Sequence, residues 1–486
     1  AELRLLGLAA AVAATVLTTG CATYVASNVE LRTMVEDGDW QRALDRIDAR
    51  EGGTDHLLEL LQRGHVLHYA GRFDESNVAF QQAEDLAASL YTRSISQQAA
   101  SLIVNDLTID YRGKPFELAM VPFYRAFNYL SLGDPDAAQV EARKATLALA
   151  DAVEATIREI RRPEDRAAAR KLQDSGLLHW FAGMLFESEG NANDAFVAYR
   201  NAARAYLAGG ALTGLPPPTA LGRDLERIGL AAGFRTEVDE LRAESPGLFS
   251  PTTDAARGPG GEVVFVLESG WIAPRDQVML NIPILATDRG YASDEDWAWG
   301  LVDRASPGWH SSVRIDYWLT VAVPTMGQAA AGPVTAVRLS SAAGSAASQP
   351  ADDLSRRAAA TLDSERGQIL FKTFLRALVK YSASQAAGNE DATFGALVNL
   401  LGVISERADT RCWLTLPDRL AVARLRLPPG RHEVEIGYLD ASGRQVYSET
   451  ETVEITDGGW VFINRRSFAY AVPRWSTPSP PAGRPV

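Results

Sequence analysis

Two pairs of residues in this sequence have the types and the spacing that chemistry requires. His65 and His68 stand three positions apart in a segment of helical periodicity, so one helix face would carry both imidazoles and could share a metal ion. No neighbouring carboxylate or cysteine completes a ligand set, and we therefore expect no metal site there. Asp409 and Arg411 form the second pair, close to Trp413, but no nucleophile or base stands beside them. We expect Asp409 and Arg411 to form a structural ion pair or a capping group rather than a catalytic site.

Other catalytic signatures are missing from the sequence. It contains no Gly-x-Ser-x-Gly nucleophile elbow, no phosphate-binding loop and no dinucleotide fingerprint. Four tryptophans could offer flat faces to sugar rings, although packing in a core or an interface is the more common role of this residue: Trp271, Trp297, Trp299 and Trp309. These observations favour a binding protein over an enzyme, and they imply no cofactor.

The two cysteines occupy different settings. Cys412 lies in a predicted strand, where a lone cysteine is more often a small buried hydrophobe than a reactive thiol. Cys21 follows an apolar run from Leu5 to Leu17, which is too short to span a bilayer but resembles the apolar region of an export signal. If Cys21 carries a lipid, Cys412 has no disulfide partner within the chain.

The end of the apolar run resembles a bacterial lipobox. Gly20 and Cys21 occupy matching positions, whereas Thr18 stands where the family prefers leucine. The resemblance implies that residues 1–20 are a signal peptide, that Cys21 receives diacylglycerol and that the protein is tethered to a membrane. Several acyl chains, each contributing about 0.8 kcal/mol per buried methylene, would attach it durably. By the same resemblance, Ala22 favours the outer membrane, with the protein facing the periplasm.

Length and charge narrow the class of protein further. The chain has 486 residues, more than one hydrophobic core usually holds, so we expect at least two domains. Its formal net charge is −13, which argues against binding to nucleic acid because that requires clustered lysine and arginine. Hydrophobic residues make up 46% and charged residues 22% of the chain, so neither global disorder nor multiple membrane spans fits.

Small, apolar and aromatic residues recur in register through the first half of the chain. Three segments match a pattern of roughly 34 residues at equivalent positions: Gly64, Leu67, Gly71, Phe73, Ser76, Phe80 and Ala83; Ala126, Tyr129, Gly133, Ala138, Ala142 and Ala145; Gly183, Phe186, Gly190, Ala195, Tyr199 and Ala202. A fourth segment fits the same frame with Leu31, Met34, Gly38, Trp40 and Ala43. The pattern resembles tetratricopeptide repeats over residues 24–209, and a generic array of helical hairpins is the alternative.

Either array would stack amphipathic helices into a groove that binds peptides or protein faces. We assign residues 21–245 to this helical domain, with further helix around Asp224–Ala243 as a cap. The period breaks between Ala83 and Val121, where a polar and aromatic insertion is expected either to recognise a partner or to cover the groove. The candidate partner-binding residues of this insertion are Asn105, Asp106, Tyr111, Arg112 and Phe116.

After Gly258–Gly261 the pattern changes to alternation. Strands are predicted at Glu262–Leu267, Val278–Leu285, Val313–Val323, Arg411–Leu416, Leu420–Leu427, Arg431–Leu439, Gln445–Ile455 and Trp460–Arg466. An Ala/Ser linker is predicted around Ser340–Gln349, and helical spacing follows at Leu370, Phe374 and Leu378 and again from Leu397 to Ile404.

The expected fold class is α+β, with an N-terminal all-α, tetratricopeptide-like repeat array followed by an antiparallel β-sandwich-like domain. Residues 262–330 and 409–472 would form the β-domain, residues 351–407 a helical insertion and residues 473–486 a disordered, proline-rich tail.

Two groups of residues resemble a little-characterised family of exported bacterial lipoproteins. The first group is the run Ala408–Pro417, followed by Ala423–Leu425 and Leu427–Gly430. The second is Asn105-Asp106 with Tyr111-Arg112-Gly113, and Phe127–Leu130 with Gly133-Asp134. The likeness spans most of the chain, and Cys412 departs from it where another small residue is expected. Family members are often encoded beside a lipoprotein activator of penicillin-binding proteins, which implies a role in the envelope and in peptidoglycan assembly.

Two functions from different classes follow. The first is a lipid-anchored cell-envelope scaffold that binds a protein partner in the groove of its repeats, with a penicillin-binding-protein activator as the implied partner. The alternative is an envelope hydrolase or carbohydrate-binding protein with a site at the junction of the two domains, suggested by the carboxylates and the four tryptophans.

Overall fold

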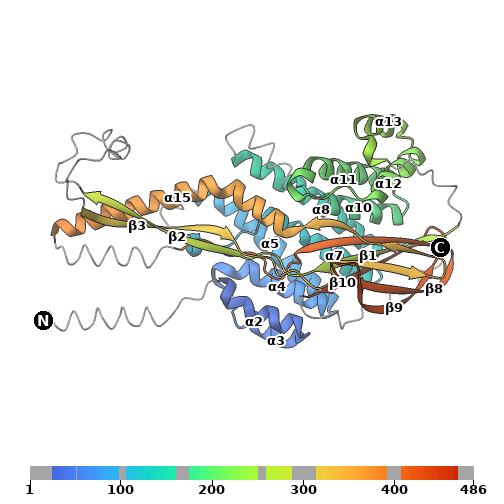
Figure 1. Cartoon of the computed structure of the whole chain (residues 1–486), viewed down its shortest axis with the longest axis horizontal. Helices are drawn as coiled ribbons and strands as arrows, with labels where there is room; N and C mark the ends of the chain where they lie inside the picture. The colour runs from blue at the N-terminus through green and yellow to red at the C-terminus, as the bar shows by residue number, and fades with distance from the viewer. Residues whose placement is uncertain are drawn as a thin grey trace.

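The computed structural model describes residues 24–50, 52–97, 106–159, 174–249, 259–286, 314–390 and 407–468 (Figure 1). Helices dominate the N-terminal half and strands the C-terminal half, which confirms the mixed α and β class. The predicted signal peptide, Cys21, Asn105, the positions from Leu397 to Ile404 and the tail at 473–486 lie outside the described residues. None of the described helices is both long and apolar enough to cross a membrane.

The described helices follow one another as hairpins, each closed by a short turn. The pairs are α2 (Tyr24–Glu36) with α3 (Trp40–Asp48), α4 (His56–Tyr69) with α5 (Phe73–Gln97), α7 (Met120–Ser131) with α8 (Pro135–Glu159), α10 (Gly176–Ser188) with α11 (Ala192–Thr213), and α12 (Thr219–Ala231) with α13 (Arg235–Glu244). A short helix, α6 (Pro115–Leu118), precedes α7. The turn glycines Gly71 and Gly133 have φ of 73° and 76°, a conformation that only glycine adopts without strain.

Small residues on the first helix of a hairpin make room for rings on the second. A Cβ atom added to Gly64 would lie 2.6 Å from the ring of Phe80, and one added to Gly183 would collide with the ring of Tyr199. Both rings are fully buried. The recurrence of small and bulky residues in the sequence therefore reflects direct packing between paired helices.

Two four-stranded sheets form the β region. The first has the order β10-β1-β7-β6, from strands β1 (Gly261–Ser269), β6 (Gln349–Asp353), β7 (Arg419–Leu427) and β10 (Trp460–Ser467). The second has the order β5-β4-β8-β9, from β4 (Ala336–Ser341), β5 (Gly344–Ala347), β8 (Gly430–Leu439) and β9 (Gln445–Ile455). Apolar residues of both sheets share one core, among them Phe265, Leu425, Val337 and Ile436.

The sequence-based prediction of the β region was wrong in three places. Strand β1 pairs with β10 in parallel, so the first sheet is mixed rather than antiparallel. Ser340–Gln349 is part of strands β4 to β6 rather than a linker, because Val337 and Leu339 bury one face of β4. Arg411–Leu416 forms a buried segment without strand pairing, since its polar groups bond to helices instead.

A long arm leaves the β region. Strands β2 (Arg275–Ala286) and β3 (Arg314–Met326) pair only with each other within the described residues, and the helix α15 (Leu354–Glu390) packs along β3. Figure 1 shows the three elements projecting together from one end of the molecule. The predicted helix around Leu370, Phe374 and Leu378 is part of α15.

Candidate functional site

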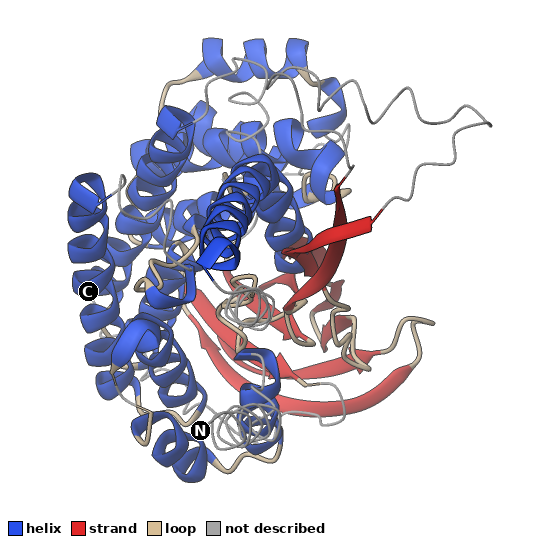
Figure 2. Ribbon diagram, turned by 90° about the vertical axis from the view of Figure 1, so that its left-hand side faces the viewer, coloured by secondary structure: helices blue, strands red, loops and turns tan. Residues whose placement is uncertain are grey.

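The first helices of the hairpins face the sheet β10-β1-β7-β6. Their apolar residues form one core with the sheet, in which Tyr124 of α7 and Phe181 of α10 join Val264 and Val266 of β1 and Val422 of β7. Figure 2 shows the helices curving along one side of the strands. The groove that we expected to receive a partner is therefore covered by the chain's own sheet.

A cluster around Glu268 joins two hairpins to the centre of this sheet. Glu268 of β1 accepts hydrogen bonds from the hydroxyls of Tyr69 (2.8 Å) and Tyr124 (2.9 Å), which come from α4 and α7. The Arg466 guanidinium of β10 lies 3.2 Å from the same carboxylate, and Asn464 donates to its other oxygen at 2.9 Å. The side chains of Glu268 and Arg466 expose no surface, so the ion pair at the centre of this cluster is shielded from solvent.

The two histidines of α4 belong to the same interface. His65 Nδ1 lies 3.0 Å from the Thr415 hydroxyl, and His68 Nδ1 lies 2.6 Å from Asn128 Oδ1. Both side chains are buried, and they bond to hydroxyl and amide groups rather than to a ligand set for a metal. In the described part of the chain, no group of three or more His, Cys, Asp or Glu could hold a metal ion.

Burial favours the neutral forms of His65, Tyr69 and Tyr124 in this cluster. The pKa of His65 is well below its usual value, first because burial disfavours the charged imidazolium and then because Arg466 and His68 are nearby. Burial likewise raises the pKa of the Tyr69 and Tyr124 hydroxyls. A neutral histidine beside a buried arginine is the arrangement expected of a packed interface.

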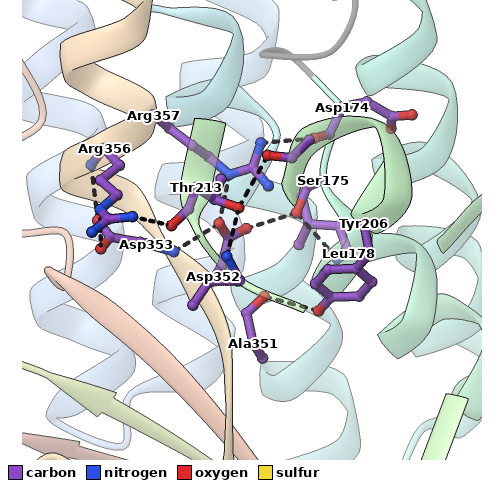
Figure 3. Close-up of polar contacts among 12 residues, drawn as sticks. Asp174, Ser175, Leu178, Tyr206, Thr213, Ala351, Asp352, Asp353, Arg356 and Arg357 are labelled. Carbon is purple, nitrogen blue, oxygen red and sulfur yellow. Dashed lines mark hydrogen bonds and ion pairs between the residues drawn. The ribbon is translucent and has the colours of Figure 1, made fainter. Parts of the chain in front are cut away.

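A second cluster joins α10 and α11 to strand β6 and the start of α15 (Figure 3). Asp352 pairs with Arg357 at 2.6 Å and accepts a hydrogen bond from the Ser175 hydroxyl, which also caps α10, at 2.8 Å. Arg357 donates to the Asp174 carbonyl at 2.7 Å, and the Tyr206 hydroxyl donates to the Ala351 carbonyl at 2.8 Å. Asp352 and Arg357 are both buried, so this cluster also serves as an internal clamp.

A third cluster ties α10 and α12 to the same face of the sheet. Asp224 forms an ion pair with Arg424 of β7, and its carboxylate also accepts a hydrogen bond from the Trp180 indole at 3.1 Å. The Arg424 guanidinium lies 5.0 Å from the Trp460 ring centre and 3.5 Å from Glu262. Together, the three clusters fix the helices to strands β1, β6, β7 and β10 of this sheet.

The segment from Asp409 to Trp413 connects α4, the insertion and the sheet. Arg411 forms an ion pair with Asp409 at 2.9 Å and with Asp55 at 3.2 Å, and it donates to the Ile109 carbonyl at 2.9 Å. The Trp413 amide donates to Glu117 at 2.7 Å, and its ring is fully buried. Asp409 and Arg411 thus form an ion pair that binds this segment to the residues before α4 and to the insertion.

Several residues of the predicted partner-binding insertion are buried in this region. Tyr111 and Phe116 expose 4% of their surface each, so neither can contact a partner without unfolding the insertion. The Tyr111 hydroxyl donates to Glu117 at 2.5 Å, and the Arg411 guanidinium lies over its ring. Arg112 is exposed, Asn105 lies outside the described residues, and only the backbone of Asp106 is described, in a short 3-10 turn.

Cys412 and Trp271 are also internal. Burial raises the pKa of the Cys412 thiol to about 12, which keeps it protonated and unreactive near neutral pH. Trp271 stacks on Phe468 with ring centres 5.0 Å apart, and it is 1% exposed. It therefore packs in the core and offers no face to a sugar, while Trp297, Trp299 and Trp309 lie outside the described residues.

A pocket of about 440 Å³ lies between α2, α3 and the start of α4. Its charged side chains have partners within the protein: Arg46 pairs with Glu30, Arg50 donates to Asn28, Asp55 pairs with Arg411, and Glu59 accepts from the Gly52 amide.

The outer helices of the hairpins, by contrast, are open to solvent. Val78 of α5, Val140 of α8 and Val197 of α11 each stand seven residues after the turn glycine of their hairpin. Their exposed fractions are 59%, 51% and 41%. Salt bridges from Lys144 to Glu84 (3.9 Å) and from Arg143 to Asp194 (2.7 Å) show that the three helices are neighbours. We call these three residues the valine row.

The sequence analysis missed the charged residues of the three clusters. Glu268, Asp352 and Arg466 stand at strand ends or inside apolar strands, where charged residues are unusual unless paired. That unusual placement was a usable signal, but the partners come from elements up to 397 residues away in the chain.

No protein-family model matches the sequence, and no curated protein matches it. One solved structure found to be similar is described as the crystal structure of BtubC (BKLC) from P. vanneervenii. The match has 14% identity and a TM-score of 0.26, and it covers 47% of this chain and 82% of that chain. Similarity at this level supports no argument about fold or function.

Proposed function

We propose that this protein is a lipid-anchored scaffold of the bacterial cell envelope, without catalytic activity, that binds a protein partner on the outer helices α5, α8 and α11. The valine row carries the proposal, because its three exposed apolar side chains stand at equivalent positions on neighbouring outer helices. The location rests on the lipobox-like segment that ends at Cys21.

We assign the helical hairpins to tetratricopeptide-like repeats and the two sheets to a β-sandwich-like domain. The turn glycines and the contacts of Gly64 with Phe80 and of Gly183 with Tyr199 support the first assignment. The shared core of the two sheets supports the second. In this proposal the β-domain takes the place of a ligand on the inner face of the repeats, which leaves the outer face for the partner.

The family resemblance suggests the class of partner. A lipoprotein activator of penicillin-binding proteins would place the scaffold in peptidoglycan assembly. The junction of the helices and the sheet is filled by buried side chains, and Trp271 is among them, so no specific observation favours the alternative of a hydrolase or carbohydrate-binding protein.

Site-specific photocrosslinking in the native envelope tests this proposal. A photoreactive residue at position 78, 140 or 197 should yield an adduct with the same envelope protein. Val446 of β9, a valine of matched exposure (42%) outside the row, is the control and should not yield it. Purified partner should then bind the wild type and bind Val140→Glu more weakly. Adducts that are absent, or equally abundant from position 446, would show that the valine row is not the docking surface.

A second measurement tests the anchor by itself. Mass spectrometry of the mature N-terminus should find an acylated Cys21. An unmodified cysteine, or a mature chain that begins elsewhere, would remove the membrane from the proposal while leaving the docking surface to be judged by the crosslinks.

A further inference from the structure

The arm formed by β2, β3 and α15 exposes an apolar surface that nothing in the described residues covers. Six consecutive residues of β2, Val278 to Pro283, are exposed. Side chains alternate between the two faces of a strand, so both faces of β2 reach solvent. Four of the six are large hydrophobic residues: Val278, Met279, Leu280 and Ile282. The neighbouring helix adds Phe371 and Phe374, of which Phe371 is 65% exposed.

The charges of the arm are segregated. Gln277–Ala286 of β2 and Tyr317–Met326 of β3 contain no charged residue. Arg366 of α15 pairs with Asp363 at 3.0 Å, and between there and Glu390 the helix carries three charged residues, all of them basic: Lys372, Arg376 and Lys380. The whole chain has a net charge of −13, so this run is opposite in sign to the rest of the protein.

Apolar side chains beside cations without intervening acids are what the surface of an anionic bilayer attracts. The hydrophobic residues enter the boundary between headgroups and acyl chains, and the cations contact lipid phosphates. A second copy of this chain would bring the same basic run of α15 against its own, which is unfavourable. We propose that the arm lies on an anionic phospholipid surface and forms a second membrane contact beside the lipid anchor.

The base of the arm is close to α2, the helix that follows the proposed lipid attachment at Cys21. Arg32 of α2 donates to the Ile272 carbonyl (3.0 Å) and the Leu414 carbonyl (2.9 Å), which fixes α2 just before the start of β2. Two residues, Ala22 and Thr23, separate Cys21 from Tyr24, the first residue of α2, and the three steps along the chain span about 10 Å. A lipid on Cys21 would thus bring the membrane to the arm, and in this respect the inference rests on the proposed function.

Vesicle flotation of the unacylated chain from Ala22 onward tests the arm separately, because this chain keeps every described element. It should float with vesicles that contain phosphatidylglycerol, more weakly with phosphatidylcholine vesicles, and less in high salt because ions screen the attraction. Met279→Asp combined with Ile282→Asp should abolish flotation, and Lys372→Glu should weaken binding at least about fivefold. The matched controls Val446→Asp and Lys144→Glu, outside the arm, should bind like the wild type. Thermal melts verify that each variant is folded.

Three results would overturn the inference: no flotation of the wild type, equal flotation of the doubly substituted arm, or binding that ignores lipid charge. A vesicle-free dimer that the double substitution converts to a monomer would identify the arm as a subunit interface and would equally contradict it. The experiment uses no acyl chain and no protein partner. An unmodified Cys21 or failed crosslinks would therefore disprove the proposed function without affecting this result.

Discussion

Glu268 and Arg466 are directly opposite each other on the adjacent parallel strands β1 and β10, and they form an ion pair in which neither side chain exposes any surface. Tyr69 and Tyr124 bring two helical hairpins onto the same carboxylate. The pair therefore connects the two ends of the β region with the helical array. Because isolated buried charges are costly, each partner depends on the other.

Removing one charge of this pair should destabilise the fold strongly. Glu268→Gln leaves the buried Arg466 guanidinium without its counter-ion, and the free energy of unfolding should fall by about 3–5 kcal/mol. Urea unfolding followed by circular dichroism measures the loss. Glu75→Gln breaks the exposed pair with Arg72 and is the control, with little expected change. Similar small losses in both variants would contradict the role given to Glu268.

A methyl group at the contact between paired helices should also be destabilising. Gly183→Ala places its Cβ against the Tyr199 ring, and the resulting overpacking should cost about 1–3 kcal/mol. Gly367→Ala in α15 is the matched control, since no atom lies within 4 Å of its added Cβ. Alanine is the better helix former there, so this variant should be stabilised by up to about 1 kcal/mol. Opposite shifts of the thermal midpoint check the prediction, and equal shifts would refute it.

His65 should make stability depend on pH in a defined direction. Its pKa in the folded protein is lowered by burial and by Arg466 and His68, so below about pH 6.5 the unfolded chain binds a proton that the folded chain does not. The free energy of unfolding should therefore decrease as the pH falls from about 6.5. His65→Gln keeps a polar group near Thr415 but cannot titrate. The wild type should lose more stability than His65→Gln between pH 7 and pH 5, and parallel curves would show that His65 does not contribute.

The Cys412 thiol should resist alkylation while the protein is folded. With its pKa raised to about 12 by burial, almost no thiolate exists near pH 8, and reagent cannot reach the sulfur. Iodoacetamide should label the chain from Ala22 onward only after guanidinium unfolding, as intact mass measures. Rapid labelling of the native protein at the rate of a free thiol would mean that the segment around Cys412 opens readily.

Local features were predicted well from the sequence. The recurrence of Gly64 with Phe80 and of Gly183 with Tyr199 locates paired helices, because residues on facing helices must match in size to approach closely. The strands β7 to β10 were likewise found from alternation and from their turn residues. Long-range pairings were not found. The parallel pairing of β1 with β10 and the burial of Tyr111 and Phe116 depend on segments far away in the chain.

The sequence by itself determined where the chain forms helices and most of its strands, and how the helices pair, since periodicity and turn glycines act within a few tens of residues. Only the tertiary structure decided which face of the helical array is free. An amphipathic helix shows that one of its faces must be buried but not against what. Here the sheet that carries Glu268 and Arg466 occupies the inner face, and Val78, Val140 and Val197 are left on the outside.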